Sequence, residues 1–232
     1  MKKLFLLKAI LVIVLMVMVV APNVQATTVT INRVVGYFSG NGVEFTLFPS
    51  ADWSGVLNYY DPLAKNIVAG APNFQSFCME LSENISFGPT YNVVFNDKAM
   101  WGSVGPLGDP LSVGAAWLYD EFRRGVLTGY DYTPLGRDIS AGMLQDTIWW
   151  LEGEAGDPTN VFSNAAVTKF GNAANAMADN NGQYSVAVLN LYNLNGSRAQ
   201  DMLVAVPEPA TMLLLGSGLL GLAGFARKRF KK

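Results

Sequence analysis

Residues 112–124 read SVGAAWLYDEFRR, and here the hydrophobic pattern changes from the period of a strand to that of a helix. Val113, Ala116 and Trp117 recur at helical spacing, and Ser112 is a residue type that caps helix N-termini. Two basic residues at the end of the stretch suit the negative end of the helix dipole. We therefore predict a helix here. By the same reasoning, further helices are predicted over residues 138–151 and within residues 161–178.

Strand-like segments lie on both sides of this central helical region. They are rich in β-branched and aromatic residues and are separated by Gly, Pro and Asn, which break regular structure. The predicted strands are residues 29–37, 43–48, 53–60, 67–68, 74–81, 91–95, 184–192 and 202–206, with a turn at 40–42. Strands, then helices, then strands predict an α+β fold: a β-sandwich-like sheet with a small helical subdomain.

The N-terminus has the three parts of a secretory signal peptide. Three lysines lie among the first eight residues, residues 4–20 are nearly all apolar, and residues 24–26 (VQA) place small side chains where signal peptidase cuts. We predict cleavage after Ala26, so that residues 1–26 are removed by signal peptidase.

The C-terminus is also tripartite. Pro207, Glu208 and Pro209 precede an uncharged segment, residues 210–226, and five basic residues follow before the chain ends. The segment is at the short end of the range for a transmembrane helix, and its basic flank predicts a cytoplasmic end. The motif resembles the PEP-CTERM sorting signal of exported bacterial proteins, here residues 206–232. That resemblance implies recognition of the Pro-Glu-Pro triplet by an exosortase, transient anchoring in the membrane, and release to the cell surface or matrix. An ordinary, uncut membrane anchor is the alternative.

Residues 27–205 are predicted to form the extracytoplasmic domain. Between the two ends, eight basic and 17 acidic residues give a net charge near −9. This charge argues against nucleic acid as a partner, since binding to phosphates needs basic surface. The chain has no histidine, which excludes a Ser-His-Asp hydrolase and a histidine-ligated zinc site. We expect no metal and no cofactor.

Two short motifs carry the residues from which chemistry is predicted. Residues 77–80 (FCME) hold the single cysteine, Cys78, on a predicted strand, and residues 144–149 (LQDTIW) hold Gln145 near the start of a predicted helix. A cysteine thiol is a strong nucleophile. If it attacks a glutamine carboxamide away from water, ammonia leaves and an internal thioester remains. A donor that stabilises oxyanion charge, which a helix N-terminus can supply, and aromatic shielding from water would assist this reaction.

The two motifs resemble those of the thioester domains of bacterial surface adhesins. The resemblance covers residues 74–152 and matches Cys78 and Gln145 to the bonded pair, with Phe77, Ile148 and Trp149 in supporting positions. Leu144 and Thr147 depart from the Thr and Ala of the family motif. The resemblance implies a single-use covalent adhesin rather than a turnover enzyme. An amine or hydroxyl on another surface would attack the Gln145 carbonyl and release the Cys78 thiolate.

Two other interpretations are open. Cys78 is equally consistent with a small buried hydrophobe and Gln145 with a surface residue, which would make the protein a passive structural component of a biofilm matrix. A carbohydrate-binding module would instead stack sugars of an extracellular polysaccharide on exposed aromatic rings. The candidate aromatics are Tyr59, Tyr60, Trp101, Tyr130 and Tyr132. The carboxylates Glu80, Glu83, Glu152 and Glu154 offer pairs for glycoside cleavage, but in so acidic a chain we expect them to be solvated.

Overall fold

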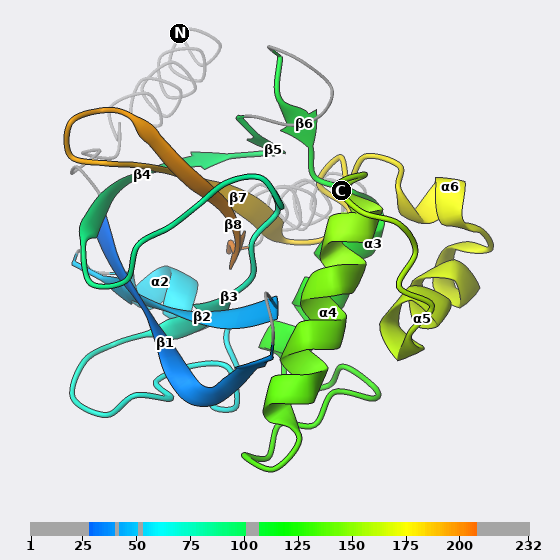
Figure 1. The fold of residues 1–232 in the computed structure, drawn as a ribbon, viewed down its shortest axis with the longest axis horizontal. Helices are drawn as coiled ribbons and strands as arrows, with labels where there is room; N and C mark the ends of the chain where they lie inside the picture. Colours follow the sequence, from blue (N-terminus) through cyan, green and yellow to red (C-terminus); the bar gives the residue numbers. More distant parts are fainter. Residues whose placement is uncertain (1–27, 40–41, 51–52, 101–106, 208–232) are drawn as a thin grey trace, which may run out of the picture.

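The computed structural model describes residues 28–39, 42–50, 53–100 and 107–207, shown in Figure 1. Its strands are β1 (Thr28–Ser39), β2 (Gly42–Pro49), β3 (Phe74–Ser76), β4 (Thr90–Asn96), β5 (Lys98–Ala99), β6 (Asp109–Pro110), β7 (Val186–Tyr192) and β8 (Arg198–Ala205). Its helices are α2 (Ser54–Leu57), α3 (Val113–Arg123), α4 (Arg137–Leu151), α5 (Val161–Phe170) and α6 (Ala173–Ala176). An antiparallel sheet with a central group of helices confirms the α+β class.

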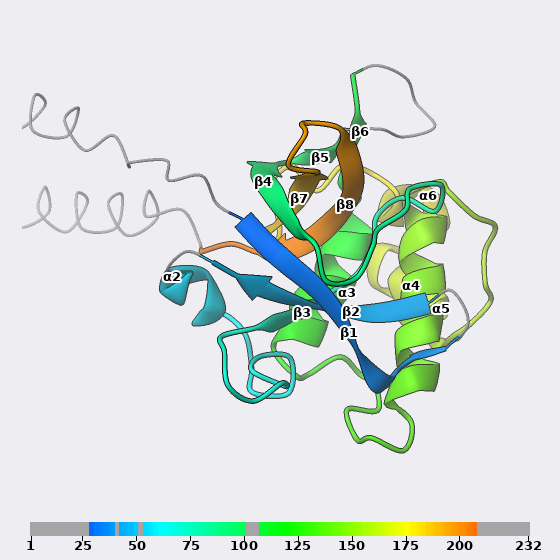
Figure 2. The ribbon, with the colours of Figure 1, turned by 60° about the vertical axis from the view of Figure 1, so that its left-hand side comes forward.

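Six strands form one antiparallel sheet in the order β3-β2-β1-β4-β7-β8. The chain that follows β3 then pairs with β8 at the other end of this order. The Leu203 N–H donates to the Phe77 carbonyl at 3.0 Å, and the Met79 N–H donates to the Asp201 carbonyl at 2.9 Å. Cys78 lies opposite Met202 between these two bonds. The sheet therefore closes on itself, and Figure 2 shows the strong twist of its strands.

This closed sheet differs from the sandwich-like sheet that the sequence predicts. Alternating side chains show which face of a strand is buried, but they do not show which strands are neighbours. The strand predicted over residues 53–60 is also wrong: α2 occupies part of it, with Trp53 and Tyr60 buried on either side. Short apolar runs of this length fit a strand and a buried helical turn equally well.

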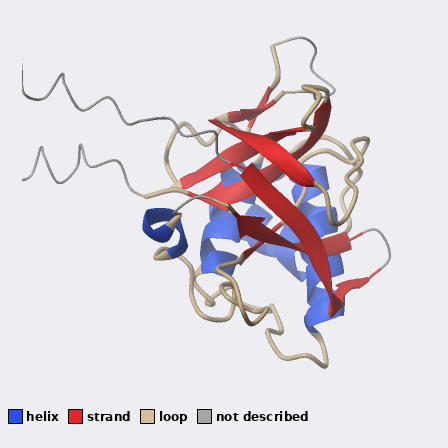
Figure 3. Cartoon of the chain, turned by 90° about the vertical axis from the view of Figure 1, so that its left-hand side faces the viewer, coloured by secondary structure: helices blue, strands red, loops and turns tan. Residues whose placement is uncertain are grey.

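The predicted central helices are confirmed as α3 and α4. The Ser112 side chain accepts a hydrogen bond from the Ala115 N–H at 3.2 Å, as an N-cap does. The third predicted helix is two helices, α5 and α6. They separate at Gly171, whose φ of +87° suits glycine and ends α5. Helices α3, α4 and α5 lie together on one side of the strands, with α4 against β1 and β2, whereas α2 lies apart from them (Figure 3).

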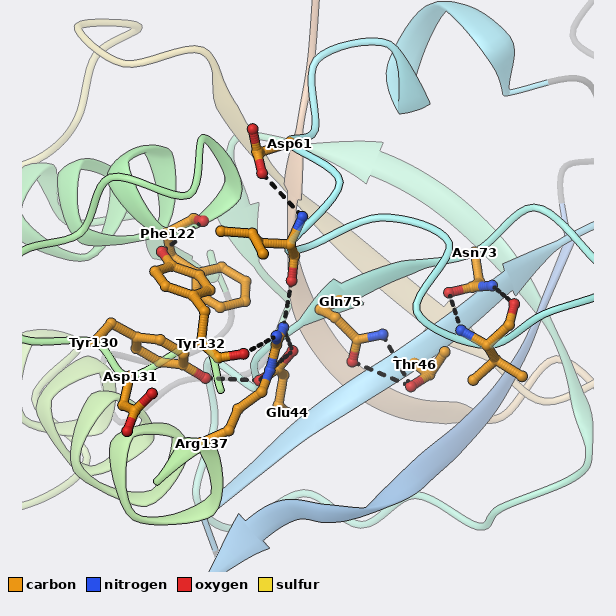
Figure 4. Close-up of polar contacts among 12 residues, drawn as sticks. Glu44, Thr46, Asp61, Asn73, Gln75, Phe122, Tyr130, Asp131, Tyr132 and Arg137 are labelled. Carbon is orange, nitrogen blue, oxygen red and sulfur yellow. Dashed lines mark hydrogen bonds and ion pairs between the residues drawn. The ribbon is translucent and has the colours of Figure 1, made fainter. Parts of the chain in front are cut away.

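A fully buried ion pair fixes α4 to β2 (Figure 4). Arg137, in the first turn of α4, places its Nη2 atom 2.6 Å from Oε1 of Glu44. The Tyr130 hydroxyl donates to Oε2 of the same carboxylate at 2.6 Å. Arg137 also donates to the backbone carbonyls of Leu63 and Tyr132. Because both charges are paired and hydrogen-bonded, this network sets the position from which the rest of α4 extends.

The two predicted membrane-associated segments, residues 1–26 and 210–226, lie outside the described residues. Among the residues that the structure does describe, no helix combines the length and the apolar character that crossing a bilayer requires.

Candidate functional site

Cys78 lies where the chain leaves β3 and joins β8. The strand predicted over residues 74–81 is shorter than expected, since β3 ends at Ser76, but Cys78 keeps an extended bridge to Met202. Its neighbours Phe77 and Met79 direct their backbone groups to β8. In extended chain, the N–H and C=O of Cys78 therefore point to the opposite side, where β2 has no partner residue for them.

Gln145 of α4 supplies the missing partner. The Cys78 N–H donates to Oε1 of Gln145 at 2.9 Å, and Nε2 of Gln145 donates to the Cys78 carbonyl at 2.8 Å. Gln145 has no exposed surface and Cys78 is 4% exposed. The structure thus brings together the two residues that the sequence motifs single out, although 67 positions separate them along the chain.

This geometry is suited to acyl chemistry at the Gln145 carboxamide. The Cys78 N–H already donates to the carbonyl oxygen on which negative charge would develop during attack. A helix N-terminus is another source of such a donor. However, Gln145 lies in the middle of α4, so the donor is the backbone of Cys78 itself. The carboxamide nitrogen, which would leave as ammonia, faces the Cys78 carbonyl.

A cavity of about 360 Å³ opens beside Cys78. Its lining includes Cys78, Glu80, Glu83, Trp149 and Gln200. Two buried polar atoms among these residues have no hydrogen-bond partner in the described structure: Oε1 of Glu80 and Nε1 of Trp149. Unpaired buried polar groups are uncommon and costly, and they often mark functional sites. Because Cys78 lines the cavity, a small molecule that enters the cavity can reach Cys78.

The three predicted supporting residues take different positions. Trp149 lines the cavity and is 7% exposed, so its ring is placed to limit the access of water. Ile148 is fully buried in the core. Phe77 does not line the cavity; its ring packs edge-on against those of Phe122 and Tyr119.

The burial of carboxylates near the cavity is the feature that the sequence does not indicate. Glu80 is 2% exposed, so the expectation of solvation is wrong for it. Burial, followed by the charges of Glu154 and Glu83, raises the pKa of Glu80 to about 9. Burial and Asp201 raise the pKa of Glu83 to about 7. Glu80 lies two positions after Cys78 in near-extended chain, and this spacing is the one signal in the sequence that places both on one face.

Burial also raises the pKa values of the Cys78 thiol and of the Glu152 carboxyl group. It raises the pKa of the Cys78 thiol well above its usual value, and the charge of Glu83 adds to this shift. Glu152 is buried at the end of α4, where its Oε1 accepts hydrogen bonds from the backbone and hydroxyl of Ser112. Solvation is therefore wrong for Glu152 as well, and burial raises its pKa to about 8.

The aromatic residues considered for sugar stacking do not form an exposed platform. Tyr60 and Tyr130 are buried, and Tyr59 and Tyr132 are half-buried. Trp101 lies outside the described residues. Within those residues, His, Cys, Asp and Glu side chains form no group of three that could hold a metal ion.

Comparison with known families identifies the C-terminal signal. Residues 205–229 match the PEP-CTERM protein-sorting motif, and the match includes Pro207, Glu208 and Pro209. The predicted sorting signal is thereby confirmed. It supports an exported surface protein that is anchored at its C-terminus before processing by an exosortase. Neither the curated proteins nor the solved structures give a match to the chain.

Proposed function

We propose that this exosortase-sorted protein is a single-use covalent adhesin of the cell surface or biofilm matrix. The observation that carries the proposal is the Gln145 carboxamide, held by two hydrogen bonds against the backbone of Cys78 in a buried site beside a cavity. This pairing holds the carboxamide against the backbone of the residue that carries the one thiol of the chain. Correct orientation of two reacting groups can by itself lower the reaction barrier by a large amount.

The bond would form in one substitution at the Gln145 carboxamide. The Cys78 sulfur attacks Cδ, a C–S bond forms, and the C–N bond breaks. The thiol proton leaves with the carboxamide nitrogen, which departs as ammonia. In the capture step, an amine or hydroxyl of another molecule attacks the same carbon and the sulfur leaves. The protein is then joined to its target through the Gln145 acyl group and cannot repeat the reaction.

Intact mass tests this proposal. The full chain, after any processing of its ends, is purified without reducing agents or amines and compared with Cys78→Ala and Gln145→Ala. We expect the parent protein alone to be lighter than its calculated mass by one ammonia, and this deficit to disappear on treatment with methylamine. A parent protein of full mass, with a Cys78 thiol that alkylates after denaturation, would exclude the thioester.

A passive matrix protein is the second candidate, and the same two hydrogen bonds favour it. Buried backbone groups need partners, and Gln145 satisfies the N–H and C=O that Cys78 does not give to β8. In that case the carboxamide is a permanent bridge between α4 and the closing segment of the sheet. The mass experiment separates the two functions, because the bridge leaves every atom of the carboxamide in place.

A further inference from the structure

Glu80 is a buried carboxyl group that the fold does not use. No hydrogen bond from the described residues reaches its side chain, and its Oε1 atom is buried without a partner. Its backbone is fixed, because the Gln200 side chain donates to the Glu80 carbonyl at 2.9 Å. Glu80 and Cys78 line the same cavity. A carboxyl group held in this way at a cavity can form hydrogen bonds with, or exchange a proton with, a molecule that enters the cavity.

The capture step needs a proton at the sulfur. A thiolate leaving into a buried site loses most of its hydration, and the raised pKa of the Cys78 thiol expresses this cost. The attacking amine must lose a proton in the same step. Histidine, the usual carrier of such protons, is absent from the chain.

We propose that Glu80 is the proton-transfer residue of capture: it gives its proton to the departing Cys78 sulfur and takes the proton that the attacking amine loses. This role rests on the proposed Cys78–Gln145 thioester. The C–N bond to the target forms and the C–S bond breaks. One proton moves from Glu80 to sulfur and one from the amine to Glu80, so the carboxyl group ends as it began.

The charges around Glu80 keep it in the form that can donate. Acidic groups face it from several elements: Glu83 from the same segment, Glu154 from beyond α4, Asp109 from β6 and Asp201 from β8. Arg33 is the cation among the cavity residues, and its guanidinium lies over the rings of Phe38 and Phe87. With a pKa of about 9, Glu80 is protonated at neutral pH.

Glu83 is a suitable control because it lines the same cavity but already accepts a hydrogen bond from the protein. Its Oε2 atom accepts a hydrogen bond from the Asp201 N–H at 2.8 Å. Glu83→Gln therefore changes charge in the cavity without removing the proposed donor. Its charge is also one of the causes that raise the pKa of Glu80, so its loss should lower that pKa.

The test follows capture of hydroxylamine by intact mass for the full chain, Glu80→Gln and Glu83→Gln. The ionisation of hydroxylamine lies below the measured range, from about pH 7 to about pH 10, so it does not shape the profile. Rates are taken per molecule that carries the ammonia deficit.

We expect the parent rate to fall as the pH rises through about 9, where Glu80 loses its proton. Glu80→Gln should be slower by roughly 100-fold and lack that fall. Glu83→Gln should react no more slowly than the parent, because loss of its charge also eases departure of the Cys78 sulfur, and its fall should move to lower pH.

The possible outcomes are distinguishable. A parent chain without the deficit overturns the thioester and this role with it. A parent chain with the deficit, but with Glu80→Gln matching its rate and pH profile, overturns the role of Glu80 alone. If folded Glu80→Gln lacks the deficit while Glu83→Gln keeps it, the same proton transfer is required when ammonia leaves, which supports the role. If both variants lack it, the side chains act through the fold and the role is overturned.

Discussion

Replacing Arg137 by alanine should sharply destabilise the protein, because it leaves the Glu44 carboxylate buried without its counter-charge. Glu44 has no exposed surface, and Arg137 donates to both of its oxygens. After the substitution, the Tyr130 hydroxyl is the remaining hydrogen-bond donor to the carboxylate that the described structure shows. Breaking one side of a buried pair typically costs about 3–5 kcal/mol. That is a large part of the roughly 5–15 kcal/mol by which domains are stable.

The loss should also depend on pH with a definite sign. Burial raises the pKa of Glu44, and the hydrogen bond and charge of Arg137 oppose that rise. Without Arg137, the pKa in the folded state lies further above its unfolded value. Stability of Arg137→Ala should therefore be greatest below about pH 4.5 and fall as the pH rises toward the folded pKa.

Urea unfolding followed by tryptophan fluorescence, at about pH 5 and about pH 8, measures both effects. The matched control is the double variant Glu44→Gln/Arg137→Met, which removes the pair without leaving a buried charge. We expect it to lose less stability than Arg137→Ala and to lack the added pH dependence. The reasoning is refuted if Arg137→Ala stays within about 1 kcal/mol of the parent, or if the double variant is the less stable of the two.

Three further predictions concern packing, titration and sorting. Gly114→Ala places a methyl group 2.7 Å from the Ala176 carbonyl oxygen, so urea unfolding should show a loss of about 1–3 kcal/mol. Because burial raises the pKa of Glu152 from 4.5 to about 8, stability should decline as the pH rises between those values. Glu152→Gln should flatten part of that decline in the unfolding free energy, and an unchanged profile would contradict the assignment. Replacing Pro207, Glu208 and Pro209 by alanine should leave the tail uncut, seen as accumulation of the longer chain on immunoblots of membranes.

The parts of the fold that depend on nearby residues could be predicted from the sequence. The helical period and the Ser112 cap placed α3, and the same period placed α4. The closure of the sheet could not be predicted, because it depends on pairing between the segment after β3 and β8, more than 100 positions later. Trp53 and Tyr60 are apolar enough for a strand, yet they bury their rings beside a single helical turn.

In the candidate site, too, some features could be predicted from the sequence and others could not. The cysteine and glutamine motifs predicted a meeting of Cys78 and Gln145, and the structure brings these residues into contact. The burial of Glu80 could not be predicted, because it arises where β6, the end of α4 and β8 come together. The acidic composition of the chain instead favoured solvated carboxylates. The N–H that reaches Oε1 of Gln145, which is that of Cys78, could not be predicted for a related reason: it depends on how α4 crosses the closing segment.

The most direct test of the covalent function is to locate the captured group. The parent chain is treated with an amine probe, denatured, alkylated and digested, and its peptides are sequenced by tandem mass spectrometry. If the thioester forms, the probe should be found as an amide on the side chain of Gln145 and the alkylating group on Cys78. An unmodified Gln145 in every peptide, with Cys78 alkylated equally with and without the probe, would contradict it.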